Sequence, residues 1–180
     1  RLGDTRLAIE IYNSVLIDGD APDTLAALAA LYEREKRYLA LAEILHRQRA
    51  ATGVTGKEAI ALLESLGQTY ADRLAAPQQA AAAWQDVLEI EPGHAKALRT
   101  LRELYANAGD FSGLERLYAR LGQQEELVDA LLGIADRLEA RAARLPLIER
   151  AAQLAQQRAD ALSPDNAGAA QALERARQVW

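Results

Sequence analysis

The sequence predicts an all-α fold of antiparallel helix pairs, with about ten helices along its 180 residues. Apolar side chains recur three and four positions apart over most of the chain, which is the spacing of an α-helix that buries one face. No segment alternates apolar and polar residues with the β-branched composition of a strand. Ala and Leu, two strong helix formers, dominate the apolar residues. Together these features favour helices throughout.

The clearest helix pair is predicted within residues 63–92. Each of its two helices carries one apolar stripe, and the small residues Gly67 and Ala80 stand where the helices must approach each other. Because so narrow a pair cannot bury its outer faces alone, it needs neighbours on both sides. The two stripes consist of Leu63, Leu66, Tyr70, Ala80, Trp84, Val87 and Leu88.

The order and spacing of these residues resemble a tetratricopeptide repeat. In that family a large apolar residue, Leu, Gly, Tyr, Ala, an aromatic residue and Pro recur with a period of about 34 residues, and Pro92 supplies the last position. The resemblance implies a right-handed α-solenoid in which the first helix of each pair lines a concave groove. It also implies that the groove holds an extended or helical segment of a partner protein.

Similar stripes recur on both sides of this pair, so we predict a single repeat array over residues 1–180. It opens with a half unit at 1–20, followed by units at about 21–55, 56–92 and 93–122. Beyond Gly122 the aromatic anchors are missing, although the helical period continues. There we predict a degenerate unit, for which a HEAT-like pair is the alternative, and a terminal helix, at 123–162 and 163–180.

Local signals predict where the helices begin and end. Residues 20–22, Asp-Ala-Pro, open a helix at the proline, and Thr55 with Glu58 has the spacing of a capping box. Pro146 is placed in a first turn, because inside a helix it would cost a hydrogen bond. Residues 163–165, Ser-Pro-Asp, are expected to open the terminal helix. Three glycines are expected to end helices in the left-handed conformation: Gly53, Gly109 and Gly122.

Composition and charge limit the partners. The net charge of -5 argues against a nucleic-acid surface, which needs clustered positive charge. No apolar run is long enough to span a membrane. Without Met, the sequence indicates a segment of a larger protein, so a signal or anchor in the flanking parts stays open and the cytoplasm is only the default compartment. The abundance of Ala and the preference for Arg over Lys are typical of a GC-rich bacterial genome.

The search for chemistry predicts no enzyme, no metal site and no cofactor. The absence of Cys excludes thiolate ligands. His46 and His94 have no second ligand at helical spacing, so a surface or capping role is expected for them. The glycines around Asp110 indicate a turn between helices and not a phosphate loop. Trp84 is interpreted as a core residue.

The resemblance supplies candidate groove residues from the first helix of each pair. Ala26, Ala30 and Glu64 stand where the chaperone-binding members of the family carry Lys or Asn, so we expect no clamp for a C-terminal carboxylate. Ala71 also falls on the groove face. The candidate partner-binding residues are Asp23, Glu33, Arg34, Glu64, Gln68, Lys96, Arg99, Glu103 and Asn107.

The sequence therefore predicts a non-catalytic scaffold that binds a protein or peptide partner in its groove. One alternative is an assembly segment that stacks on the rest of a longer solenoid or on another copy. Exposed apolar faces at the two ends would favour it, with Ile9, Tyr12 and Leu16 at one end and Leu173 and Trp180 at the other. A second alternative is an accessory domain of a multidomain enzyme or regulator.

Overall fold

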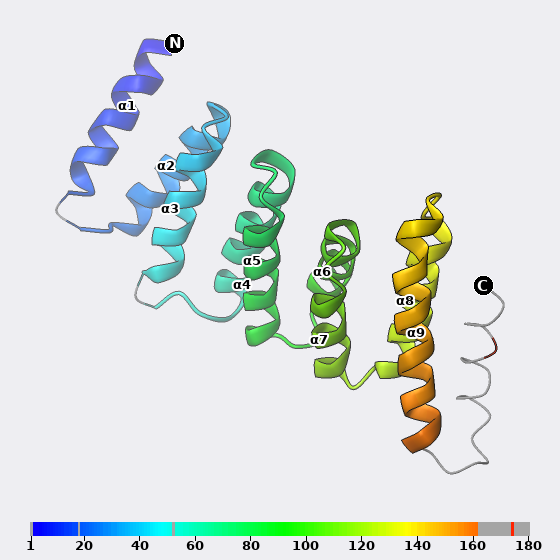
Figure 1. Ribbon diagram of the computed structural model, residues 1–180. Helices are drawn as coiled ribbons and strands as arrows, with labels where there is room; N and C mark the ends of the chain where they lie inside the picture. The colour runs from blue at the N-terminus through cyan, green and yellow to red at the C-terminus, as the bar shows by residue number, and fades with distance from the viewer. Residues whose placement is uncertain (1, 18, 52, 162–173, 175–180) are drawn as a thin grey trace. The chain divides into compact units, whose positions relative to one another are not determined.

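The computed structural model describes residues 2–17, 19–51, 53–161 and 174 (Figure 1). Over these residues it consists of nine α-helices and one π-helical turn, without a strand. The chain divides into two compact units, Arg1–Leu104 and Tyr105–Trp180. The all-α prediction is confirmed. The terminal helix expected at 163–180 lies outside the described residues, and the proposed repeat boundaries stay a prediction.

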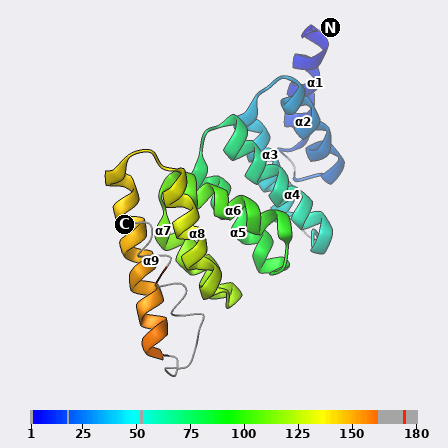
Figure 2. The ribbon, with the colours of Figure 1, turned by 90° about the vertical axis from the view of Figure 1, so that its right-hand side faces the viewer.

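The first unit contains α1 to α5 and most of α6, and its neighbouring helices pack on one another (Figures 1 and 2). The pairs α2 with α3 and α4 with α5 each share an apolar interface, and α3 also packs on α4. The bounds are α1 Leu2–Val15, α2 Pro22–Arg34, α3 Tyr38–Ala50, α4 Gly56–Gln68, α5 Pro77–Ile90 and α6 Ala95–Ala108. The fully buried side chains of this unit include Leu25, Leu28, Leu66, Trp84, Val87, Leu88 and Leu101.

An aromatic ring packed on a glycine closes the α4–α5 pair. Trp84 is 1% exposed, and a Cβ atom on Gly67 would lie 2.5 Å from its Nε1 atom. No carbon atom fits at that distance, so the ring occupies the place of the missing side chain. Ala80, the other small residue of the pair, is fully buried on α5. Gly67 therefore makes room for an indole ring and not only for a close backbone approach.

After Gln68 the chain continues in a π-helical turn, Thr69–Arg73. The Leu74 N–H donates to the Thr69 carbonyl at 3.1 Å, the bond pattern that adds a residue to the turn. The Thr69 hydroxyl donates to the Ser65 carbonyl at 2.8 Å and satisfies a buried polar side chain. The turn thus begins two residues after Gly67, the glycine on which the Trp84 ring packs.

Most predicted helix ends are confirmed. Helix α2 begins at Pro22, and Gly109 and Gly122 follow the last residues of α6 and α7 with a positive φ. Gly53 also has a positive φ, but it does not end a helix, because α3 ends at Ala50 and its C-cap residue Ala51 is extended. The capping box at Thr55 is wrong, because its side chain makes no cap hydrogen bond. Gly56, the first residue of α4, has a φ of 54°, so the residue after Thr55 lacks the helical backbone that normally follows an N-cap.

The second unit contains the end of α6, α7 Phe111–Leu121, α8 Gln124–Arg137 and α9 Arg141–Ala161. Asp110 caps α7, with Oδ1 accepting from the Gly113 N–H at 2.8 Å. A Cβ atom on Gly113 would lie 2.7 Å from the Tyr105 ring. Between α7 and α9, Arg150 donates to both oxygens of Glu115, at 2.5 and 2.7 Å.

The position of Pro146 is a correction. It lies inside α9 and does not begin it, since the helix already starts at Arg141. Pro146 follows the first turn closely, so it removes one backbone bond near a helix end, and its ring is exposed. The buried residues that follow it hold the helix on α8 and offset this loss: Leu147, Ile148, Ala151 and Ala155.

Candidate partner-binding site

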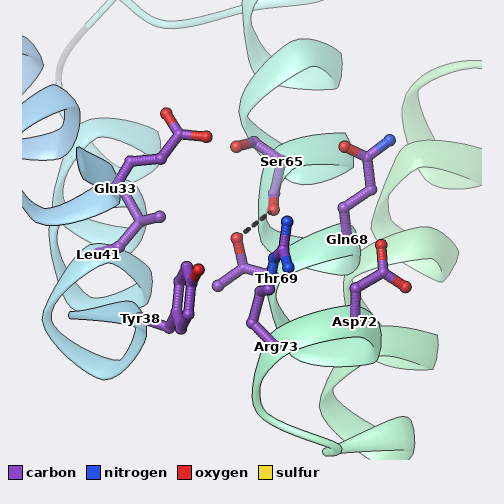
Figure 3. A pocket seen from close by; sticks show the side chains of 8 residues that line it. All are labelled: Glu33, Tyr38, Leu41, Ser65, Gln68, Thr69, Asp72 and Arg73. Atoms are coloured by element: carbon purple, nitrogen blue, oxygen red, sulfur yellow. Dashed lines mark hydrogen bonds between the residues drawn. The ribbon is translucent and has the colours of Figure 1, made fainter. Parts of the chain in front are cut away.

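A small open pocket lies in the first unit between the α2–α3 pair and α4 with its π-helical turn (Figure 3). Its volume is about 120 Å³, below the several hundred Å³ that a small-molecule site usually offers. A space of this size suits one side chain of a bound segment. Eight residues line it: Glu33, Tyr38, Leu41, Ser65, Gln68, Thr69, Asp72 and Arg73.

The residues of the α4 side that reach this pocket share one helical face. Counted from Ser65, the pocket residues Gln68, Thr69, Asp72 and Arg73 follow at the i+3, i+4, i+7 and i+8 positions, the spacing of one side of a helix. Ala71 lies on a neighbouring side and does not line the pocket.

Charges of both signs meet in the pocket. The carboxylates of Glu33 and Asp72 lie on opposite sides of it (Figure 3), and the Arg73 guanidinium stands 5.4 Å from the centroid of the Tyr38 ring. Within the described part of the chain, the structure records no ion pair for these three charged groups. The pocket therefore offers both hydrogen-bond acceptors and a donor to a polar side chain from outside.

Two of the nine predicted groove residues, Glu33 and Gln68, meet in this pocket. Both are exposed, and they come from α2 and α4, the first helices of consecutive pairs. This is the arrangement that the resemblance implies for a groove. Their role in binding stays a prediction.

Two further predicted groove residues bond to each other. Lys96 Nζ donates to Glu64 Oε2 at 2.9 Å and lies 5.3 Å from the centroid of the Trp84 ring. His94 Nε2 is 3.6 Å from Glu64 Oε1. This cluster ties α4 to the start of α6, so Glu64 and Lys96 are already engaged within the protein.

The remaining predicted groove residues do not join the pocket. Arg34 donates to Thr5 Oγ1 at 2.8 Å and links α2 to α1. Three others are exposed on α2 and α6, and Asn107 is exposed in the second unit. The three on the first unit are Asp23, Arg99 and Glu103.

Six pocket residues were not among the predicted groove residues. Tyr38 and Leu41 lie on the second helix of a pair, and their apolar spacing indicated packing. Asp72 and Arg73 lie seven and eight residues after Ser65, on a side of the helix next to the one that the resemblance assigned to the groove. Ser65 and Thr69 sit on the groove side of α4 next to predicted positions, so the helical period could have found them.

Both histidines have structural partners. His94 Nδ1 accepts from the Ala97 N–H at 3.3 Å at the start of α6, which confirms the expected capping role. His46 Nε2 lies 2.9 Å from the Tyr70 hydroxyl. Among the residues that the structure describes, no three His, Asp or Glu side chains gather as metal ligands. None of the helices in this described part combines the length and apolarity needed to cross a bilayer.

The helix pairs and the aromatic-on-glycine packing define a tetratricopeptide-like helical-repeat protein. No family model and no curated protein matches the sequence.

Among solved structures, the chain is similar in fold to one described as the crystal structure of MamA protein, with 20% identity and a TM-score of 0.49 over 88% of this chain and 86% of that chain. A second MamA crystal structure has 19% identity and a TM-score of 0.48, over 88% of this chain and 92% of that one. A third is described as YrrB, a TPR protein with an unusual peptide-binding site. It has 18% identity and a TM-score of 0.48, over 96% of this chain and 85% of the other.

Proposed function

We propose that this protein is a non-catalytic interaction scaffold that holds a segment of a partner protein across α2 and α4. The observation that carries the proposal is the open pocket in which Glu33 of one helix pair meets Gln68 of the next. A segment laid across consecutive first helices passes over this position. One of its side chains enters the pocket.

The polar lining supports a specific contact and not a purely apolar one. The side chains of Glu33, Asp72 and Arg73 line the pocket, so both negative and positive charges border a small space. A partner side chain that pairs with one of them gains a charge-assisted hydrogen bond, which is stronger than a neutral one. The size of the pocket restricts this contact to a single side chain.

The nearby ion pair between Glu64 and Lys96 bears on which kind of partner segment can bind. Glu64, held by Lys96 at 2.9 Å, stands where a carboxylate clamp of the chaperone-binding type would need Lys or Asn. An ionised carboxylate only accepts hydrogen bonds, so Glu64 cannot donate one to a C-terminal carboxylate. We therefore propose an internal segment of the partner as ligand and not a C-terminal carboxylate.

The test selects 12-residue peptides from a random phage library on the immobilised chain and measures their affinity in solution. Gln68→Arg places a long side chain over the pocket and is expected to weaken the selected peptides at least tenfold. Gln78→Arg is the matched control, because Gln78 is an exposed glutamine on α5 and receives the same charge. Peptides that bind both variants as tightly as the parent chain would rule out this pocket as the site.

A further inference from the structure

Helix α1 exposes a row of large apolar side chains. Leu7, Ile11 and Val15 are 57%, 53% and 44% exposed, and they recur every four residues, so they lie on one side of the helix. Ile17, just beyond the helix, is also exposed. Four large apolar residues at one edge of a folded unit form a patch of the kind that marks an interaction surface.

A different side of α1 is already covered. Ile9 and Leu16 are buried at 7% and 6%, and α1 packs on α2 (Figure 1). Ile9 and Leu16, whose exposure would have favoured stacking by this end of the chain, are therefore covered within the protein. Tyr12 is half-buried and lies between the covered and uncovered sides.

The sequence register shows which surface of a helix pair is uncovered. Ala8, Tyr12 and Val15 repeat the spacing of Ala80, Trp84 and Val87 on α5. In the same alignment, Ile11 corresponds to Ala83 and Leu16 corresponds to Leu88. On α5 all five of these positions are buried, whereas on α1 only Leu16 is.

The exposed surface at Ile11 and Val15 therefore corresponds to one that α4 helps to cover on α5, whereas Leu7 aligns with Gln79, which is exposed. The contact that identifies this surface is the Trp84 ring on Gly67. In the register of α1, Tyr12 takes the place of that ring. A helix that covers this face would need a small residue opposite Tyr12. It would also need an apolar stripe that packs on Ile11 and Val15.

We propose that this face of α1 binds an amphipathic helix built like α4, oriented on α1 as α4 is on α5. Its apolar stripe covers Ile11 and Val15, and a Gly or Ala in it lies against Tyr12. Arg6 and Glu10 pair with each other at 3.2 Å on the exposed polar side and leave this stripe free of charge. The surface is separate from the pocket near Gln68, so either site can fail without the other.

The test supplies such a helix from the chain itself. Residues 55–76, which carry α4 and its turn, are fused directly before Thr5, so that they precede α1 as they precede α5. The fusion is expected to slow hydrogen exchange of the α1 amides by at least about tenfold and to raise the thermal midpoint. Unchanged exchange in α1 would overturn the proposal.

Matched variants separate docking from a general effect of added length. Ile11→Gln in the fusion is expected to abolish the added protection, whereas Glu10→Gln on the polar side is expected to retain it. Leu63→Lys with Leu66→Lys in the fused copy alone is expected to act like Ile11→Gln. Equal protection in all these fusions would overturn the proposal as well.

Sedimentation of the parent chain over a range of concentrations tests a second copy as the occupant. The proposal predicts no dimer that depends on Ile11. A dimer that dissociates in the Ile11→Gln variant would show that this face of α1 binds the same face of a second copy. That result would contradict the proposal that a helix like α4 is its partner.

Discussion

The α4–α5 pair and the α6–α7 connection use the same contact with the roles of the two helices exchanged. In the first, the ring of Trp84 on the second helix lies against Gly67 on the first. In the other, the ring of Tyr105 lies on the first helix and Gly113 on the second. Each contact combines one large aromatic residue with one glycine, so the volume is conserved, but the aromatic residue lies on the second helix in one pair and on the first helix in the other. The two pairs therefore carry their small residue on opposite helices.

The two contacts differ in what surrounds the glycine. At Gly67 the three nearest atoms all belong to the rigid indole ring of Trp84. At Gly113 the nearest atom is an oxygen of Asp110, a side chain that also caps α7. We therefore expect the first contact to be less tolerant of change than the second.

The largest effect is expected from removing the ring at the first contact. Trp84→Ala leaves a cavity against Gly67 and should lower the free energy of unfolding by about 3–5 kcal/mol. Urea unfolding followed by circular dichroism measures this loss. A loss below about 1 kcal/mol would contradict the view that this contact closes the pair.

A smaller effect is expected from adding a methyl group on the glycine side. Gly67→Ala places a carbon about 2.5 Å from Trp84 Nε1, and overpacking of this kind costs about 1–3 kcal/mol. Gly113→Ala should cost less than Gly67→Ala, because part of its clash falls on the flexible Asp110 carboxylate.

Double-mutant cycles sharpen this comparison. Trp84→Leu combined with Gly67→Ala should cost less than the sum of the single changes, since the smaller side chain leaves room for the methyl group. Strict additivity would show that Gly67 is needed for another reason.

The smallest effect is expected from an ion pair in the second unit. The two hydrogen bonds from Arg150 hold the pKa of Glu115 below its ordinary value of 4.5. A carboxylate whose pKa is lowered on folding stabilises the protein above the pKa of the unfolded chain, and this contribution is lost as the pH falls through the lowered value. Both side chains are partly exposed, so the contribution is at most about 1 kcal/mol.

Unfolding free energies measured between pH 7 and pH 3 test this pair. Arg150→Gln should flatten the acid side of the curve, and Arg141→Gln, an exposed arginine on the same helix, should leave it as in the parent chain. An identical slope in the parent and in Arg150→Gln would contradict the assignment.

The sequence predicted the helices well, whereas the binding role of the proposed groove residues stays a prediction. Helical spacing located α2 to α5, and the resemblance placed Glu33 and Gln68 on one groove, where the structure joins them. It missed Asp72 and Arg73, because the groove positions taken from the resemblance, Glu64, Gln68 and Ala71, follow a neighbouring side of the helix and share only Gln68 with the pocket. It also misplaced Pro146 in a first turn, because the packing of the residues that follow outweighs the lost hydrogen bond.

The exposed surface of α1 was harder to predict for a related reason. The apolar residues of α1 surround more than one side of the helix, so their spacing alone does not show which side α2 covers. Ile9 and Leu16, which the stacking alternative needs on an exposed face, are buried, whereas Leu7, Ile11 and Val15 are exposed. Only the position of a neighbouring helix separates these two sides.

The most direct test of the proposed function maps a selected peptide on the isotope-labelled chain by nuclear magnetic resonance. The account predicts amide shift changes grouped on Glu33, Tyr38 and the segment from Ser65 to Arg73, and it predicts their loss in Gln68→Arg. Shift changes confined to α5, or to the exposed side of α1, with the pocket residues unaffected would contradict it.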